Sequence, residues 1–189
     1  SQAKKKIENS YSKTYSTIKG ENPSTFIDIS LGQLKGLNIH ILGSVKYPGV
    51  YAMHPFSDPF TALFYAGGID TIGSLRDIQV HRNGIKLHSI DLYDIIHGGS
   101  IKEQIRLLDQ DIIFVPSRKS KVIVNGAITI PGYFELINSE TALDLINYAG
   151  GLATNASSVI TLKRIQSPFS RQNDDLAINY FHIPIDSLP

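Results

Sequence analysis

Cysteine is absent from the 189 residues, so the chain has no disulfide framework and no thiolate chemistry. The formal net charge of +1 gives no field that would attract nucleic acid or an anionic membrane. No apolar run approaches the ~20 residues that a membrane helix needs. The chain opens without an initiator Met, at Ser1-Gln2-Ala3, so we expect an excerpt or a processed product. These absences exclude several classes of partner and leave the compartment open.

Catalytic and metal-binding patterns are also weak. No G-x-S-x-G elbow is present to raise a serine nucleophile above a sheet. His81 and His88 have no third ligand at a recognisable spacing, and we interpret them as surface residues. Asp109 and Asp111 stand just before an apolar strand, where carboxylates usually form turns. The glycine pairs follow predicted helices, whereas a phosphate-binding loop precedes its helix. We therefore expect no enzyme, no cofactor and no metal site.

What the chain does contain is an internal repeat. Residues 41–69 return as residues 124–152 without a gap, each residue 83 positions after its counterpart. The identical positions include Gly43 with Gly126, Pro48-Gly49 with Pro131-Gly132, and the four residues 65–68 with 148–151. A fixed period indicates that one supersecondary unit occurs twice, here as a module of roughly 80 residues. A duplicated small module more often binds or assembles than catalyses.

The first copy is predicted to form a small sheet. Two strands are expected over residues 38–45 and 50–53, joined by a type II turn at Pro48-Gly49. A hairpin follows over residues 78–90 and folds at Asn83-Gly84. Pairing across that turn places four apolar side chains on the core face, namely Ile78, Val80, Ile85 and Leu87. The last strands are expected over residues 105–108 and 112–115, separated by a turn at 109–111.

Each copy also contains a helix that ends at a glycine pair. Asp58 is predicted to cap the first helix, which stops at Gly67-Gly68. Thr141 and Asp144 cap the second, which stops at Gly150-Gly151. The side chains expected to face inward are Phe60, Leu63, Phe64, Leu143 and Ile146. A further helix over residues 4–18 and a short strand over residues 26–31 precede the first copy.

These elements predict an α+β fold of two tandem β-grasp modules, each a small mixed sheet with a helix packed across it. An N-terminal helix and leading strand occupy residues 1–36, the first module 37–118, and the second, C-terminally incomplete, 119–189. Strands of the second copy are predicted over residues 121–128, 133–137, 159–165 and 177–185. A counterpart of residues 94–116 is missing, so either this module is truncated or another segment fills its open edge.

Aromatic residues near the Pro-Gly turns are candidate ligand contacts. Sugars present flat apolar faces ringed by hydroxyls, so tyrosine beside charged or amide groups suits carbohydrate. We take Tyr47, Tyr51, Tyr133 and Arg76 as the candidate ligand-binding residues. Tyr51 also fits a core position, because it matches Phe134 in the second copy, whereas Tyr47 beside a turn is expected to be exposed.

Five motifs occur in a specific order along residues 26–186. They are Val45–Tyr51, Ala62–Gly68, Gly73–Arg76, Ile90–Asp94 and Leu107–Pro116. This ordered set resembles the soluble-ligand-binding β-grasp (SLBB) domain, and it is similar to the paired copies in bacterial polysaccharide biosynthesis and export proteins. The resemblance implies a periplasmic, outer-membrane-associated component of capsule or exopolysaccharide secretion, in which such domains form stacked rings.

Two functions remain open. The resemblance implies a module that assembles with copies of itself or with other export-machinery subunits and contacts polysaccharide; any membrane contact would come from other parts of the parent protein. The alternative is a soluble-ligand domain that holds a glycan or a cobalamin-type ligand without a transport role. The first predicts exposed apolar patches and an open second module. The second predicts a concave groove with aromatic and polar lining.

Overall fold

The structure is a computed structural model, and its contacts divide the chain into two units, Ser1–Lys35 and Gly36–Pro189. The residues that it describes are 2–18, 25–28, 32, 34–99, 104–167, 169, 171 and 177–188. The boundary that the sequence predicts between the two copies, inside the second unit, stays a prediction.

The helix of the first unit is shorter than predicted. Helix α1 spans Gln2–Tyr11 and a 3₁₀ turn, η1, spans Ser16–Ile18, where the sequence predicts one helix over residues 4–18. A local hydrogen bond forms where α1 ends: the Ser12 hydroxyl donates to the Asn9 carbonyl at 3.0 Å. Serine side chains compete in this way with helical backbone pairing.

The strand predicted over residues 26–31 is not formed in its described part. Residues 25–28 have no regular structure, and residues 29–31 lie outside the described residues. Two tyrosines of this segment are largely exposed, Tyr11 at 54% and Tyr15 at 55%.

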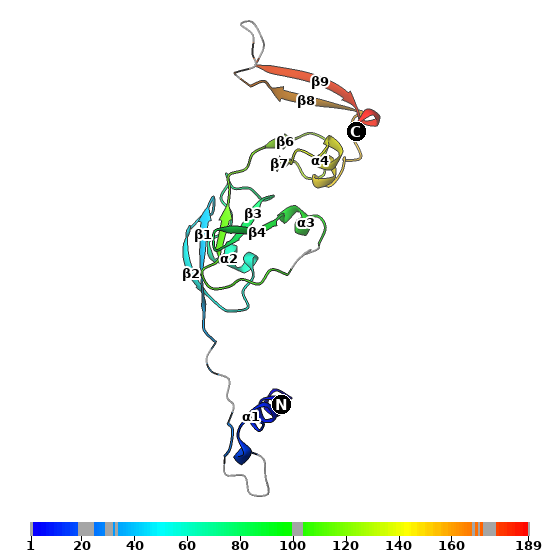
Figure 1. Cartoon of the computed structure of the whole chain (residues 1–189). Helices are drawn as coiled ribbons and strands as arrows, with labels where there is room; N and C mark the ends of the chain where they lie inside the picture. Colours follow the sequence, from blue (N-terminus) through cyan, green and yellow to red (C-terminus); the bar gives the residue numbers. More distant parts are fainter. Residues whose placement is uncertain are drawn as a thin grey trace. The chain divides into compact units, whose positions relative to one another are not determined.

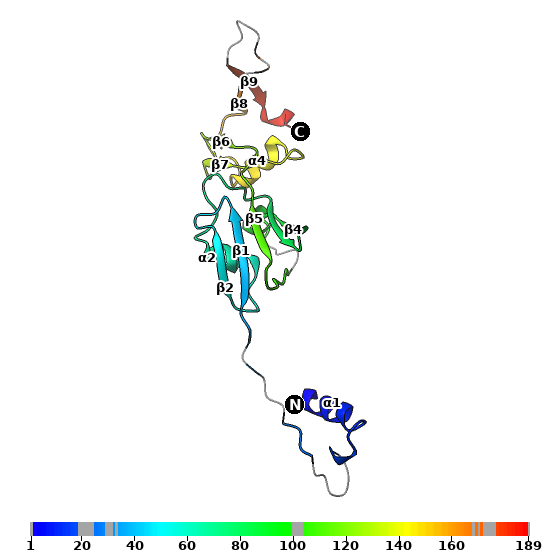
Figure 2. The same ribbon diagram turned by 60° about the vertical axis from the view of Figure 1, so that its left-hand side comes forward.

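The second unit begins with a five-stranded mixed sheet, whose strands stand in the order β2-β1-β5-β3-β4 (Figures 1 and 2). Strand β5 pairs in parallel with β1 and antiparallel with β3, so the last of these strands in the sequence lies at the centre of the sheet. The strands are β1 (Leu37–Gly43), β2 (Gly49–Met53), β3 (Ile78–Arg82), β4 (Ile85–Ile90) and β5 (Ile112–Val115). Together with the helices, this sheet confirms the predicted α+β class.

Both predicted helix starts and stops are confirmed. Asp58 caps α2 (Pro59–Tyr65), and its carboxylate accepts a first-turn N–H at 2.7 Å. Thr141 and Asp144 form a capping box at the start of α4 (Ala142–Tyr148). The glycines after both helices have positive φ, which side chains with a Cβ rarely adopt: Gly67, Gly68, Gly150 and Gly151.

The inward faces of these helices differ from the prediction at two positions. Phe64 is 83% exposed and Leu143 is 46% exposed, although both were expected to face the core. Helical neighbours three and four apart share a face. In α2 that face contains Ala62, Leu63 and Ala66, which are buried against the sheet, and it leaves Phe64 on the other side.

The β3–β4 hairpin turns at the predicted Asn-Gly pair but contains a β-bulge. The register shifts after Val80, so that Ile78 lies opposite Ile90. Leu87 therefore leaves the core face and is 42% exposed. Ile85 keeps its position opposite Arg82 beside the turn and is 64% exposed, so the predicted burial is wrong for both residues. Ile90 takes the core position instead. Because side chains alternate between the two faces of a strand, one extra residue is enough to exchange them.

The connection between β1 and β2 is not the type II turn predicted at Pro48-Gly49. Gly49 has no positive φ; the left-handed position is Gly43, at +86°, where the chain leaves β1. Residues 44–48 then form a loop whose N–H groups donate to carbonyls at the end of α2, at 2.9 and 3.0 Å. The Pro-Gly pair therefore opens β2 rather than closing a tight turn.

Residues 105–108, predicted as a strand, have no regular structure. Their backbone instead helps to satisfy the fully buried Asp111, which accepts from the Leu108 N–H at 2.8 Å. The Arg82 guanidinium donates to both carboxylate oxygens of Asp111, each at 2.8 Å. A buried charge requires partners of this kind. The turn predicted at residues 109–111 is confirmed, with Gln110 at φ +69°.

The second copy repeats the local structure of the first. The N–H groups of Lys46 and Thr129, 83 residues apart, donate to Gly68 and Gly151 carbonyls, both at 3.0 Å. The register of β1 with β2 recurs between the two short strands of the second copy, at matched residues throughout. These strands are β6 (Val122–Val124) and β7 (Gly132–Phe134).

The sheet itself does not recur. Strands β6 and β7 form one two-stranded sheet, and β8 (Val159–Ile165) with β9 (Ile178–Pro184) forms another (Figure 1). Within the described ranges no strand joins these hairpins, so the expected single mixed sheet of the second module is not formed there. The remaining elements are α3 (Leu92–Ile96) and η3 (Ile185–Ser187).

The central position of β5 gives a prediction for two matched glycines. A Cβ at Gly43 would lie 2.2 Å from the Val115 carbonyl oxygen, whereas a Cβ at Gly126 meets nothing within 4 Å. Both have positive φ, +86° and +99°. We expect Gly126→Ala to cost about 1–2 kcal/mol and Gly43→Ala more than about 3 kcal/mol, because only the latter adds a backbone clash. Urea unfolding followed by circular dichroism measures both; equal losses would contradict the prediction.

Candidate functional site

The three candidate tyrosines are not gathered into one site. Tyr47, in the loop after β1, is 58% exposed, as predicted, and Lys46 Nζ lies 5.5 Å from its ring centroid. Tyr51, in β2, packs against the core, and its hydroxyl donates to the Tyr47 carbonyl at 2.6 Å. Tyr133, in β7, is 61% exposed, with Lys121 Nζ 3.9 Å from its ring centroid. Tyr47 and Tyr51 therefore lie together in the first copy, whereas Tyr133 lies in the second copy.

Arg76, the fourth candidate, is buried between the two copies and is bonded to acceptors from both. Its Nε donates to the two oxygens of Asp91, each at 2.8 Å. Nη1 and Nη2 donate to the Glu140 carboxylate at 3.0 and 2.7 Å, and Nη1 also donates to the Glu135 carbonyl at 3.1 Å. With its side chain 5% exposed, Arg76 bridges the two copies, and its predicted role in ligand binding stays a prediction.

A charged side chain of the second copy, that of Glu135, is in turn held by groups of the first copy. Glu135, from the second copy, is 6% exposed, and its carboxylate accepts from the Ser74 hydroxyl at 2.7 Å and the Leu75 N–H at 2.8 Å. Its backbone N–H donates to the Tyr93 hydroxyl at 2.9 Å. Each copy thus contributes a buried charge that the other copy satisfies, which meets the requirement for burying ions at an interface.

Aromatic rings enclose this contact. The Arg76 guanidinium carbon lies 4.3 Å from the Tyr93 ring centroid and 5.5 Å from that of Tyr148, within range for cation–π attraction. The Tyr93 and Tyr148 rings meet edge to face at 5.1 Å. The His97 ring lies beside them, with its centroid 5.2 Å from that of Tyr93 and 5.0 Å from that of Tyr148. We call the cluster of Arg76, Asp91, Tyr93, Glu135, Glu140 and Tyr148 the inter-copy contact.

The inter-copy contact shifts pKa values in directions that favour its charged form. Burial alone would lower the pKa of Arg76, but hydrogen bonds to Glu140 and Asp91 raise it. Burial opposes ionisation of Glu140 as well, yet donors from Arg76, Tyr148 and the Ile137 N–H lower its pKa below the ordinary value. Burial, and then the hydrogen bond to Glu140, raises the pKa of Tyr148 to about 12. The Tyr148 hydroxyl therefore remains protonated and donates to Glu140 at 2.5 Å.

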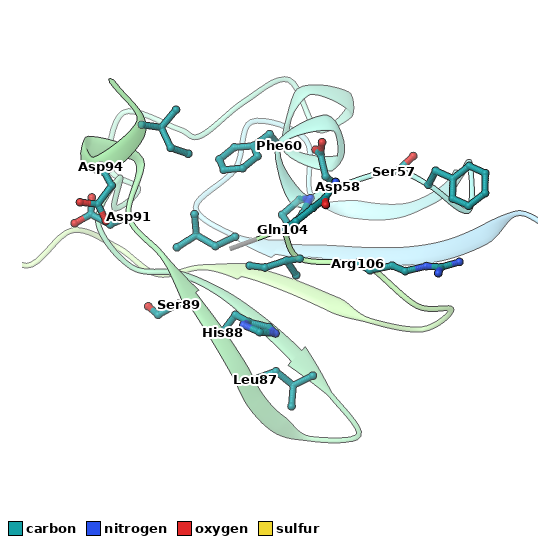
Figure 3. Close-up of a pocket in the computed structure, with 15 residues that line it drawn as sticks. Ser57, Asp58, Phe60, Leu87, His88, Ser89, Asp91, Asp94, Gln104 and Arg106 are labelled. Carbon is teal, nitrogen blue, oxygen red and sulfur yellow. The ribbon is translucent and has the colours of Figure 1, made fainter. Parts of the chain in front are cut away.

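The first copy also contains a cleft of about 890 Å³, shown in Figure 3. This volume lies in the range of small-molecule sites. In Figure 3 Asp58 and Phe60 border it from the start of α2, and Leu87, His88 and Ser89 border it from β4. The β-bulge contributes here, because it turns Leu87 away from the core and toward the cleft. None of the four sequence-predicted ligand residues lines the cleft.

The chemistry of the cleft is mixed. Phe56 is 69% exposed, and the Arg106 guanidinium carbon lies 5.7 Å from its ring centroid. Gln104 adds an amide, and Asp94 borders the cleft from α3. Apolar rings beside a guanidinium, an amide and carboxylates suit a ligand with apolar faces and hydroxyl groups. Among the described residues, no group of three or more histidine, cysteine, aspartate or glutamate side chains is placed to hold a metal ion.

Comparison with known families bears on the second copy. Residues 121–171 match the SLBB domain. The SLBB match covers β6, β7, α4 and β8 and stops before β9. No match to the chain was found among curated proteins. None of the helices in the described part of the chain is long and apolar enough to cross a membrane.

Neither the inter-copy contact nor the cleft was predicted from the sequence. One signal for the contact was present: Glu135 lies between Phe134 and Leu136, where the matched residue of the first copy is Ala52. A carboxylate that replaces alanine in an apolar strand needs a partner. The cleft had no such signal, because separate segments line it and a bulge orients one of them.

The inter-copy contact predicts a large effect of removing its cation. Arg76→Met leaves the Glu140 and Asp91 carboxylates buried without their partner, and we expect a loss of about 3–5 kcal/mol. Lys86→Met is the control, because it breaks the exposed ion pair with Asp77 and should cost less than about 1 kcal/mol. Hydrogen exchange of the Leu75 N–H, with urea unfolding, measures both. Similar losses in the two variants would contradict the bridging role.

The same contact should weaken in acid. The pKa of Glu140 is lowered on folding, so its contribution is complete above the ordinary glutamate pKa of about 4.3 and is lost as pH falls through the lowered value. Amide exchange of Ile137, which donates to Glu140, should accelerate in that window. Glu140→Gln is the control and should remove most of this pH dependence; an unchanged profile in the variant would assign it to another group.

Proposed function

We propose that the chain is the periplasmic part of an outer-membrane polysaccharide (capsule or exopolysaccharide) export protein. In this proposal two SLBB-type modules act as one block that assembles with copies of itself or with other subunits of the export machinery. Polysaccharide contacts this block during transit. The proposal assigns binding and assembly to the chain and no catalysis.

The tandem character of the proposal is supported by the repeat. The SLBB match covers residues 121–171 of the second copy, and the first copy has the same helix stops, loop hydrogen bonds and strand register at a spacing of 83 residues. A segment with the same sequence pattern and the same backbone pairing is the simplest candidate for a second SLBB module.

The observation that carries the assembly function is the inter-copy contact. Arg76 and Glu135 cross from one copy to the other and are both satisfied there. Two modules joined only by a linker would move independently, whereas buried charges held by specific partners favour one relative orientation. A ring-forming component needs such an orientation, because a small angular error at each subunit prevents closure.

Exposed apolar side chains at matched positions support docking with neighbours. Tyr47 and its counterpart Ile130 are 58% and 55% exposed, and Val50 and its counterpart Tyr133 are 59% and 61% exposed. The same outward positions are thus apolar in both copies. Apolar residues that stay exposed in a folded unit are typical of interaction surfaces.

A second candidate function is soluble-ligand binding without transport, and the cleft favours it. Its volume of about 890 Å³ and its lining of rings, an amide and a guanidinium suit a glycan or another ligand of similar polarity. The two functions are compatible in one protein, since export requires contact with glycan. They differ in whether association or ligand binding is the main property of the isolated chain.

Sedimentation of the chain over a range of concentrations tests the assembly function. We expect self-association that rises with concentration and falls in the double variant Tyr47→Ser, Tyr133→Ser, because two exposed rings are removed. Lys13→Ser in the first unit is the control and should not change association. A chain that stays monomeric at millimolar concentration, alone and with export partners, would contradict the proposal.

Titration with capsule oligosaccharides, followed by NMR shifts, tests glycan contact. Binding at millimolar or tighter concentration should shift the amides of Phe56, Leu87 and Arg106 and weaken in Arg106→Ala. Arg171→Ala is the matched control outside the cleft. Shifts confined to Tyr47 or Tyr133 would move the glycan site to the tyrosines predicted from the sequence. No shift anywhere, beside clear self-association, would leave assembly as the function.

A further inference from the structure

One carboxylate belongs to both the cleft and the inter-copy contact. Asp91 lines the cleft beside α3 (Figure 3), and both of its oxygens accept from Arg76 Nε, each at 2.8 Å. The Asp91 side chain is 22% exposed, whereas that of Arg76 is 5% exposed and does not line the cleft. A ligand in the cleft therefore meets a carboxylate that Arg76 already holds.

Helix α3 also takes part in both sites. Asp91 caps it by accepting from the Tyr93 N–H at 2.8 Å. Asp94 and Ile95 line the cleft, whereas Tyr93 is buried and its ring packs against that of Tyr148 in the second copy. Neighbouring residues of a helix point in different directions, so this short helix has one side on the cleft and another on the inter-copy contact. A shift of α3 would change both.

The hydrogen bonds of Asp91 indicate which ligands it can accept. Arg76 already compensates its charge, and a carboxylate has about four acceptor sites, which the described donors Arg76 and Tyr93 fill only in part. A neutral hydroxyl group can donate to a remaining site without displacing either donor. A protonated amine would instead compete with Arg76 for the same charge. The rings of Phe56 and Phe60 in the same cleft suit the apolar face of a sugar.

We propose that Asp91 is a ligand-binding residue of the cleft and that Arg76 positions it for this role. A hydroxyl group of a neutral sugar donates to the Asp91 carboxylate, which the inter-copy contact holds in place. The affinity of the cleft in the first copy thus depends on the packing of the second copy. This inference rests on the ligand-binding function proposed for the cleft, and it adds the class of ligand and the residue that couples the two sites.

The coupling follows from the cost of ordering a side chain. With the inter-copy contact formed, Arg76 fixes Asp91, so ligand binding does not have to order it. When the contact opens, Arg76 loses its acceptors in the second copy, Glu135 and Glu140, and its pair with Asp91 meets water, where such pairs are weak. The affinity for ligand then falls. Linkage requires the reverse effect as well: an occupied cleft keeps the inter-copy contact closed.

Tethering tests this coupling, because it places a sugar in the cleft at any affinity. The chain contains no cysteine, so Gln104→Cys, at an exposed position of the cleft lining, gives the full chain one thiol. A glucosyl methanethiosulfonate links glucose to that thiol through a disulfide and releases methanesulfinate. The readout is hydrogen exchange of the Glu135 N–H, which donates to the Tyr93 hydroxyl across the inter-copy contact. We expect this exchange to slow by about fivefold or more.

The same reagent on Lys13→Cys, in the first unit, is the matched control and should leave exchange of the Glu135 N–H unchanged. Two other groups on the Gln104→Cys thiol test the class of ligand. A 2-aminoethyl group is positively charged and should speed the exchange, because it competes with Arg76 for Asp91. An n-propyl group has no hydroxyl and should slow the exchange less than glucose does.

Asp91→Asn should abolish the slowing by glucose, because the amide no longer holds Arg76 at both oxygens. If circular dichroism shows this variant to be unfolded, the three groups on the Gln104→Cys protein decide the question by themselves. Equal exchange with all three groups, or slowing by glucose that persists in Asp91→Asn, would overturn the proposal. The titration with oligosaccharides is a separate result: absence of binding there contradicts the ligand-binding function, whereas the tethered sugar measures the coupling alone.

Discussion

The guanidinium group of Arg76 is the constraint on which the arrangement of the second unit depends. It is bonded to Asp91 in one copy and to Glu140 in the other, and it lies against the rings of Tyr93 and Tyr148. These groups are stable in the interior only together, since each would be a buried, unsatisfied group without the rest. The inter-copy contact thus holds the two copies in one relative orientation.

The second copy depends on this contact in a further way. Its small core of Phe134 and Ala149 includes Tyr93, and Leu75 packs against it, so two side chains of the first copy complete it. The first copy needs no such help, because β5 closes its core with fully buried aliphatic residues. The second copy, whose described residues contain no counterpart of β5, therefore gains stability by packing against the first copy.

The features that could be predicted from the sequence are local. Asp58 and Thr141 cap helices through hydrogen bonds that span three residues, and the glycine pairs stop the helices through backbone angles that glycine alone adopts easily. The repeat predicted that one supersecondary unit occurs twice, and the register of β1 with β2 does recur between β6 and β7 at matched residues. One failure is also local in origin: a bulge after Val80 shifted the pairing of β4 from His88 onward and put Ile90 in the core in place of Leu87.

The amino-acid sequence by itself determined the α+β class, the duplication, the helix ends and the absence of a recognisable catalytic pattern, since each depends on short spacings along the chain. Only the tertiary structure decided that Arg76 is bonded to acceptors of both copies, that the cleft lies away from the candidate tyrosines, and that β5 has no described counterpart in the second copy. Those outcomes depend on groups that are distant in the sequence, such as Arg76 and Glu140, 64 residues apart, whose proximity is set by the packing of whole modules. The spacing of these residues in the sequence does not predict that they lie close together.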